Sequence, residues 1–194
     1  MNIGIDIDDV LVDTSTYMLR HLNEIFGTGY KREQILAWHI EELFLEHGTR
    51  EELFLKIRDY ARTRGEEILP LAGAVEAVKV LSKDNLLIAI TAREEDLKEM
   101  TIRSLEKNFK GNIKEVYFAG LSGKKRRKKS DIIREKNIDL YIDDRWEYVL
   151  DCALTGCKVL LFDHPWNRRG ELPSNVTRVH NWQEIIREIE KLTK

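Results

Sequence analysis

The stretch NIGIDIDDVLVDT, residues 2–14, places three aspartates directly after a short apolar run. The apolar residues predict the first buried strand of the fold, over 2–6. Carboxylates this close together repel one another and resist burial. A strand that ends in such a cluster is therefore expected to face a positively charged partner. The residues at the ends of the other strands indicate what that partner is.

Further short apolar runs predict the remaining strands of a sheet. They are LLIAIT at 86–91, EVYFAG at 115–120, LYIDD at 140–144 and KVLLFD at 158–163. Apolar residues at successive positions are typical of parallel strands that are covered on both faces, and helical patterns separate these runs. We therefore predict an α/β fold with a three-layer, Rossmann-like core and a mostly parallel sheet. Helices are expected over 14–26, after Thr49, and over 74–81, 94–109 and 182–192.

The first two predicted strands are unusually far apart. Residues 7–85 separate them, whereas a strand–helix–strand unit needs only about 30 residues. The excess is helical by its apolar spacing and its capping signals. We therefore predict a core domain formed by 1–14 and 71–194, with a small helical cap, 15–70, inserted after the first strand.

The overall charge of the 194-residue chain is −2, which provides no global field for nucleic acid or an anionic membrane. The basic run GKKRRKK at 123–129 is expected to be a solvated loop rather than a nucleic-acid site. Apolar runs are too short to span a bilayer, and no signal peptide is evident. We expect a cytoplasmic protein; the sequence does not indicate its oligomeric state.

Polar side chains gather where the predicted strands end. They are Asp6 and Asp8 after the first strand, Thr91, Ala92 and Arg93 after the second, Asp143 and Asp144 in LYIDD, and Lys129, or its competitor Lys128, at the start of the preceding helix. In a parallel α/β sheet, ligands bind at this edge. Acids from two strand ends cannot all stay ionised without a cation, and a hard, oxygen-liganded ion such as Mg²⁺ is expected.

These residue types suit phosphoryl transfer. Asp6 can act as a nucleophile, and Asp8, two residues further on, can protonate the leaving oxygen and then deprotonate water. Thr91, neighbouring backbone N–H groups and the lysine can hold a phosphate. Asp9 lies one residue after Asp8, so in an extended chain its side chain points to the opposite side from those of Asp6 and Asp8. It is expected to have a solvated or helix-capping role.

DIDDVL at 6–11, Thr91, Lys129 and the acidic pair at 143–144 resemble, in order, the four motifs of the haloacid dehalogenase superfamily. The resemblance covers essentially the whole chain. It implies that Asp6 is the nucleophile and a metal ligand, and that Asp8 is the acid/base, with its carbonyl also on Mg²⁺. It further implies that Asp144 binds the metal directly and Asp143 through water, while Thr91 and Lys129 hold the phosphate.

Within the superfamily, PLAGAVEAVKVL, ITAR, KSDIIREKNIDLYIDDR and FDHPWNR resemble the 5'(3')-deoxyribonucleotidase, or cytosolic type C 5'-nucleotidase, family. That family removes the phosphate from nucleoside monophosphates, so the resemblance implies such a small phosphate ester as the substrate. The chain departs from the animal members at Asp9, where Gly is common, and at TAR, which replaces a TSP-like motif. Both departures concern nucleotide selectivity rather than phosphatase chemistry.

Several assignments stay open at this point. Trp38, Trp166 and Asn167 are candidate substrate contacts, although a place in the cap core is favoured for Trp38. Arg93 could bind substrate or pair with a neighbouring glutamate. Rival functions are a phosphatase or phosphomutase for a sugar phosphate or another small metabolite, a receiver-like phosphoacceptor and a catalytically silent binding protein. A receiver has no acidic pair after its lysine, whereas here the pair at 143–144 follows Lys129.

Overall fold

A computed structural model describes residues 1–122 and 125–192, so part of the basic run at 123–129 lies outside the described residues. The fold is built on one six-stranded parallel sheet with the strand order β3-β2-β1-β6-β7-β8. The strands are β1 (Asn2–Ile5), β2 (Leu86–Thr91), β3 (Glu115–Phe118), β6 (Leu140–Asp143), β7 (Lys158–Phe162) and β8 (Val176–Val179). The α/β prediction is confirmed, and the five predicted strands are all present.

The edge strand β8 is the one member of the sheet that the sequence did not reveal. Its four residues, VTRV, are only half buried, with Thr177 and Arg178 at intermediate exposure. An edge strand pairs on one side only, so it needs no continuous apolar run. A short antiparallel hairpin, β4 (Leu121–Ser122) and β5 (Lys125–Arg126), was also not predicted.

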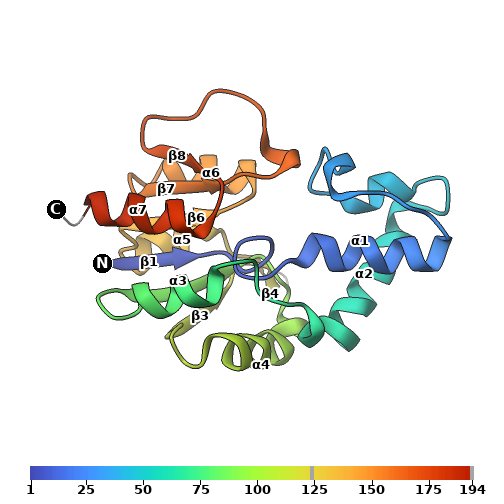
Figure 1. Cartoon of the computed structure of the whole chain (residues 1–194), viewed down its shortest axis with the longest axis horizontal. Helices are drawn as coiled ribbons and strands as arrows, with labels where there is room; N and C mark the ends of the chain where they lie inside the picture. Colours follow the sequence, from blue (N-terminus) through green and yellow to red (C-terminus); the bar gives the residue numbers. More distant parts are fainter. Residues whose placement is uncertain (123–124, 193–194) are drawn as a thin grey trace.

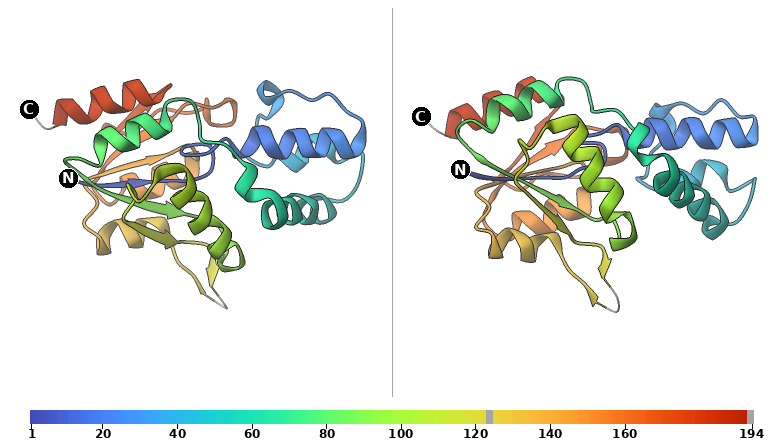
Figure 2. Two further views of the ribbon diagram at one scale, coloured as in Figure 1. Left: turned by 60° about the horizontal axis from the view of Figure 1, so that its bottom comes forward. Right: turned by 90° about the horizontal axis from the view of Figure 1, so that it is seen from below.

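Helices cover both faces of the sheet, because alternate strand residues point to opposite sides. Figure 2 shows α3 and α7 on one face and α5 and α6 on the other. Ile5 and Leu87 belong to the cluster on the first face, and Ile88 and Tyr141 belong to the cluster on the second. The helices are α3 (Ala74–Leu81), α4 (Lys98–Phe109), α5 (Lys129–Glu135), α6 (Trp146–Ala153) and α7 (Trp182–Leu192).

The part of the chain from α1 (Thr14–Phe26) to the 3-10 helix η3 (Gly65–Glu67), which lies between β1 and α3, forms a helical layer beyond the carboxyl ends of the strands (Figure 1). It also contains α2 (Arg50–Arg64) and the short 3-10 helices η1 (Arg32–Gln34) and η2 (Ile40–Phe44). The predicted signals are confirmed: Gly27 ends α1 with a φ of 65°, and Thr49 and Glu52 form a capping box at α2. The division into a core and a 15–70 cap stays a prediction. Within the described residues, no helix has the length and apolarity needed to cross a membrane.

Candidate active site

Three buried carboxylates meet at the carboxyl ends of the two central strands. The backbone N–H of Asp6 donates to Ile142 O at 2.9 Å, which holds the end of β1 against β6. One carboxylate oxygen from each of Asp6, Asp143 and Asp144 lies within 4.8 Å of the others. Buried charges of one sign are stable only when opposite charge compensates them. The cluster therefore requires a cation or protons.

Lys129 supplies part of that positive charge. Its Nζ lies 2.9 Å from Asp6 Oδ1 and 2.7 Å from Asp143 Oδ2, and its side chain is only 1% exposed. The competing Lys128 is 68% exposed and points toward Asp151. Of the two candidate lysines, the structure brings Lys129 to the predicted site and leaves Lys128 on the surface. One ammonium group still leaves the three acids with a deficit of positive charge.

Asp6, the acid that follows β1, shows this deficit directly. Burial raises the pKa of Asp6 to about 7, with Lys129 opposing the rise and Asp143 adding to it. Burial, together with Asp143, raises the pKa of Asp144 well above its usual range. Asp6 Oδ1 is buried and accepts no hydrogen bond from the described residues, although the Lys129 ammonium is near. A hard cation fits this set, because every possible ligand atom is a carboxylate oxygen. One of these oxygens, Asp6 Oδ1, also receives no hydrogen bond within the described part of the chain that would compete with the cation.

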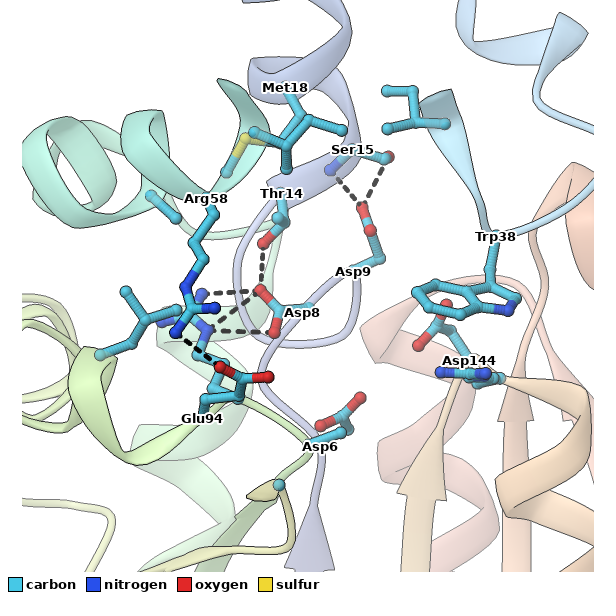
Figure 3. Close-up of a pocket in the computed structure, with 18 of the residues that line it drawn as sticks. Asp6, Asp8, Asp9, Thr14, Ser15, Met18, Trp38, Arg58, Glu94 and Asp144 are labelled. Carbon is cyan, nitrogen blue, oxygen red and sulfur yellow. Dashed lines mark hydrogen bonds and ion pairs between the residues drawn. The ribbon is translucent and has the colours of Figure 1, made fainter. Parts of the chain in front are cut away.

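Asp8, two residues after Asp6, has different surroundings (Figure 3). Arg93 donates to both carboxylate oxygens, from Nε to Oδ2 at 3.0 Å and from Nη2 to Oδ1 at 2.6 Å. Thr14 Oγ1 donates to Oδ1 at 2.5 Å. Burial opposes ionisation of this carboxyl, but Arg93 and Thr14 outweigh it and hold the pKa of Asp8 below its ordinary value. Arg93 thus pairs with an aspartate rather than with a neighbouring glutamate.

The turn after β2 lies beside these acids, because the Arg93 side chain within it contacts Asp8. Thr91 is fully buried, and its Oγ1 accepts a hydrogen bond from the backbone N–H of Arg93 at 3.1 Å. A Cβ atom on Gly120 would lie 2.4 Å from the carbonyl oxygen of Arg93, so only glycine fits there. Ala92, Arg93 and Gly120 all line the cavity described next. Sequence reasoning found the turn but not the role of Gly120.

A cavity of about 430 Å³ opens above the acids, between the sheet edge and the helical layer. Its polar side includes Asp6, Asp8, Asp144, Arg58, Arg93 and Arg145. Its apolar side comes from the helical layer and includes Met18, Ile35, Ile40, Phe54 and Ile57. A cavity with one charged end and one apolar wall suits a small ligand that carries both an anion and an apolar group.

Comparison with known proteins identifies the family. The model of the family described as "5' nucleotidase, deoxy (Pyrimidine), cytosolic type C protein" matches residues 1–193. The chain belongs to this nucleotidase family. A nucleotidase of Clostridium acetobutylicum is 28% identical over 192 residues, which cover 99% of this chain and 95% of that protein.

Solved structures of haloacid dehalogenase-like proteins share the fold. One from Agrobacterium tumefaciens, of unknown function, superposes with a TM-score of 0.70 at 16% identity, over 99% of this chain and 98% of its own. A haloacid dehalogenase-type hydrolase from Bacillus subtilis, bound to magnesium, superposes with a TM-score of 0.66 at 14% identity, over 97% of both chains. This member of the nucleotidase family is therefore a phosphoric monoester hydrolase with a haloacid dehalogenase fold.

The candidate substrate contacts of this nucleotidase differ in their placement. Trp38 is 41% exposed and lines the cavity, with the Arg145 guanidinium 3.5 Å from its ring centroid. The sequence favoured a place in the cap core for Trp38, and this prediction is wrong, because the side chain is too exposed for a core residue. Trp166 lines the cavity and donates to Asp144. Asn167 is fully buried, and its amide donates to the backbone oxygens of Asp144 and Phe162.

Asp9 has the helix-capping role, and the solvated alternative is wrong. Figure 3 shows its side chain diverging from that of Asp8 toward Ser15. Its Oδ1 accepts from the backbone N–H of Ser15 at 3.1 Å and from the Ser15 hydroxyl at 2.7 Å, in the first turn of α1. Its φ is +55°, a left-handed conformation that glycine adopts most easily and aspartate tolerates.

Several charged residues near the site were not found from the sequence. Arg58 on α2 pairs with Glu94 at 2.7 Å and with Asp96 at 2.9 Å. Arg32 on η1 pairs with Asp9 at 3.1 Å. Their partners lie far away along the chain, so no local spacing reveals them. Arg145, which directly follows the acidic pair, is the one that its position could have indicated.

Proposed function

We propose that this enzyme is a Mg²⁺-dependent phosphatase that acts through an aspartyl-phosphate intermediate on nucleoside 5'-monophosphates. The observation that carries the proposal is the arrangement of Asp6 with Lys129, Asp143 and Asp144 at one sheet edge, with a second carboxylate, Asp8, beside them. The magnesium bound to the structurally similar Bacillus protein and the nucleotidase relatives support it.

The chemistry that the residues support has two steps. A carboxylate oxygen of Asp6 attacks phosphorus, the bond to the ester oxygen breaks, and Asp8 donates a proton to the leaving alkoxide. Asp8 then takes a proton from a water molecule that attacks the phosphoryl group on Asp6, which releases phosphate and restores Asp6. In the free enzyme Arg93 keeps Asp8 ionised. The substrate phosphate would draw Arg93 away, so that Asp8 can take up from solvent the proton that it then donates.

The remaining polar groups would hold the phosphate and the metal. Lys129, the Thr91 hydroxyl, the backbone N–H of Ala92 and the Arg93 guanidinium would bind phosphate oxygens. Mg²⁺ would neutralise charge on the transferring group.

The two acids of the LYIDD motif are prepared differently for the metal. Asp143 accepts from Lys129, from the Tyr141 hydroxyl at 2.6 Å and from Arg145 N at 2.7 Å. Asp144 has one oxygen bonded to Trp166. These contacts support direct metal binding by Asp144 and an indirect role for Asp143.

The test of the chemistry is phosphate release by Asp6→Asn and Asp8→Asn proteins. We expect losses of several orders of magnitude in both, because groups that act as a unit fail together. Full activity in either protein would overturn the mechanism.

The substrate class is tested with a Mg²⁺-containing panel of ribo- and deoxyribonucleoside monophosphates, sugar phosphates and an aryl phosphate. The apolar wall and the exposed Trp38 support a nucleoside as the leaving group. A preference for sugar phosphates would overturn the nucleotide assignment and leave the phosphatase chemistry standing.

A further inference from the structure

The indole of Trp166 makes direct contact with the acidic cluster. Its Nε1–H donates to Asp144 Oδ2 at 2.8 Å, and the residue is only 5% exposed. Trp166 lies in the short 3-10 helix η5 (Pro165–Asn167), which follows β7, whereas Asp144 follows β6. Two neighbouring strands thus deliver a carboxylate and its donor to the same point.

The segment that carries Trp166 is fixed on several sides. Asn167 Nδ2 donates to Asp144 O at 2.6 Å and to Phe162 O at 2.7 Å. Arg178 Nη2 donates to Asn167 O at 3.0 Å. These bonds tie the segment to the backbone on both sides of the indole, so Trp166 has little freedom to move.

A buried histidine packs against one face of the indole. The His164 ring stacks on the Trp166 ring at a centroid distance of 4.5 Å, and its Nε2 lies 2.7 Å from Asp9 O. Because a carbonyl oxygen only accepts, Nε2 must carry the proton, and Nδ1 is left to accept from Arg32 at 3.2 Å. The loop that carries Asp6 and Asp8 and the segment that carries Trp166 are therefore held together.

We propose that Trp166 is a positioning residue for the metal-binding carboxylate of Asp144, rather than a substrate contact. Its N–H engages one carboxylate oxygen and orients the other toward Asp6 and Asp143. A neutral donor suits this task, since it fixes the carboxylate without adding a positive charge that would compete with the metal. The inference rests on the proposed function, because it assumes that the acidic cluster binds Mg²⁺.

The test measures Mg²⁺ binding directly, by calorimetric titration of the full-length, chelator-treated protein with MgCl₂. Trp166→Phe removes the N–H and keeps an aromatic ring, and we expect the Kd for Mg²⁺ to rise roughly 10- to 100-fold. The KM for the phosphate ester at saturating Mg²⁺ should stay unchanged, because Trp166 does not bind substrate in this proposal.

Trp182→Phe is the matched control. Trp182 is fully buried and donates its indole N–H to Val10 O at 3.1 Å, so this variant loses an equivalent bond to a backbone carbonyl. Its Mg²⁺ affinity should equal that of the native protein. If Trp166→Phe does not fold, the isostere 3-benzothienylalanine at position 166 keeps the bicyclic shape, lacks only the N–H, and should show the same weakened binding.

The outcomes separate this inference from the proposed function. Native protein that binds Mg²⁺ while the position-166 variants bind it equally well would overturn the positioning role alone. The same holds if Trp182→Phe weakens binding as much as Trp166→Phe, or if Trp166→Phe changes only KM. A native protein that does not bind Mg²⁺ would overturn the metal site itself, and this inference with it.

Discussion

Asp6 and Asp8 lie two residues apart in one loop, yet the protein surrounds them in opposite ways. Asp6 shares its site with Asp143, Asp144 and a single ammonium group, and its pKa is raised to about 7. Asp8 receives a guanidinium and a hydroxyl, and its pKa is lowered. The charge of Asp8 is therefore compensated by the protein itself, whereas the charges of the cluster around Asp6 are compensated only in part. A metal ion bound at that cluster would supply the missing positive charge.

Removing the Lys129 ammonium group is the most severe test of this difference between Asp6 and Asp8. In Lys129→Met, Asp6 and Asp143 lose their shared buried counter-charge. We expect phosphate release to fall at least about 10³-fold and the free energy of unfolding of the metal-free protein to fall by about 3–5 kcal/mol. Phosphate release and urea unfolding measure the two effects.

The neighbouring lysine provides the control for that variant. Lys128→Met removes a largely exposed side chain, so it should change the free energy of unfolding by no more than about 0.5 kcal/mol. Equal losses in the two variants would show that the buried ammonium has no special role at the cluster.

The second prediction uses pH and the raised pKa of Asp6. Because the folded-state pKa of about 7 exceeds the unfolded value of about 3.9, the unfolded chain loses its proton first as pH rises. Asp6 therefore lowers the stability of the metal-free protein progressively between about pH 4 and pH 7, by up to about 4 kcal/mol.

Urea unfolding of native and Asp6→Asn proteins across that range isolates the effect. The variant should gain stability relative to native as pH rises, and saturating Mg²⁺ should reduce the gain by favouring the ionised Asp6. A difference that stays flat from pH 4 to pH 7 would contradict the account of Asp6 as a destabilised carboxylate.

How much of this could be predicted from sequence depends on how local each signal is. The buried strands were recognised, because their apolar runs are continuous and helices separate them. The edge strand β8 was missed, because its interior residues are Thr and Arg and it needs only one apolar side. The predicted helix over 94–109 begins regularly only at Lys98, after a 3-10 turn over Glu95–Leu97.

The sequence predicts that the acids lie together with Thr91 and Lys129, since the ends of parallel strands share one edge of the sheet. It does not predict which side chains bond to those acids. Arg93 on Asp8 and Trp166 on Asp144 depend on side-chain directions across loops that no spacing rule fixes. The different direction of Asp9 followed from its place one residue after Asp8, whereas its bonds to Ser15 and its left-handed backbone became visible only in the structure.

The third prediction removes the guanidinium from Asp8. Arg93→Met should reduce phosphate release about 10- to 100-fold, because it removes a proposed phosphate donor and the group that holds Asp8. The lowered pKa of Asp8 contributes stability above about pH 4, and that contribution is lost as pH falls through the folded-state pKa. The stability difference between native and variant should therefore be largest near neutral pH and shrink in acid, opposite to the trend for Asp6.

Arg93→Lys is the matched control for this variant. It keeps the charge but cannot reproduce the two-point contact with Asp8, so its activity should fall between those of native and Arg93→Met. Native activity in Arg93→Met would separate Arg93 from both the phosphate and Asp8.

The smallest expected effect concerns a charge pair at the exposed mouth of the cavity. Arg58 on α2 reaches Glu94 and Asp96 in the turn after β2, and all three side chains are about one-third exposed. Exposed pairs contribute little and are screened by salt, so Arg58→Gln should change the free energy of unfolding by less than about 1 kcal/mol. Because this pair links the helical layer to the turn that we propose binds phosphate, we expect KM to rise roughly two- to threefold at low salt, and the difference to disappear at high salt. Arg50→Gln, which breaks an exposed pair with Glu42 inside the helical layer, should leave KM unchanged at both salt concentrations.

The prediction would be contradicted if Arg58→Gln had an effect as large as that of Lys129→Met, or one that salt does not diminish. Burial would then not explain why the Lys129 ion pairs matter more than the exposed pairs of Arg58.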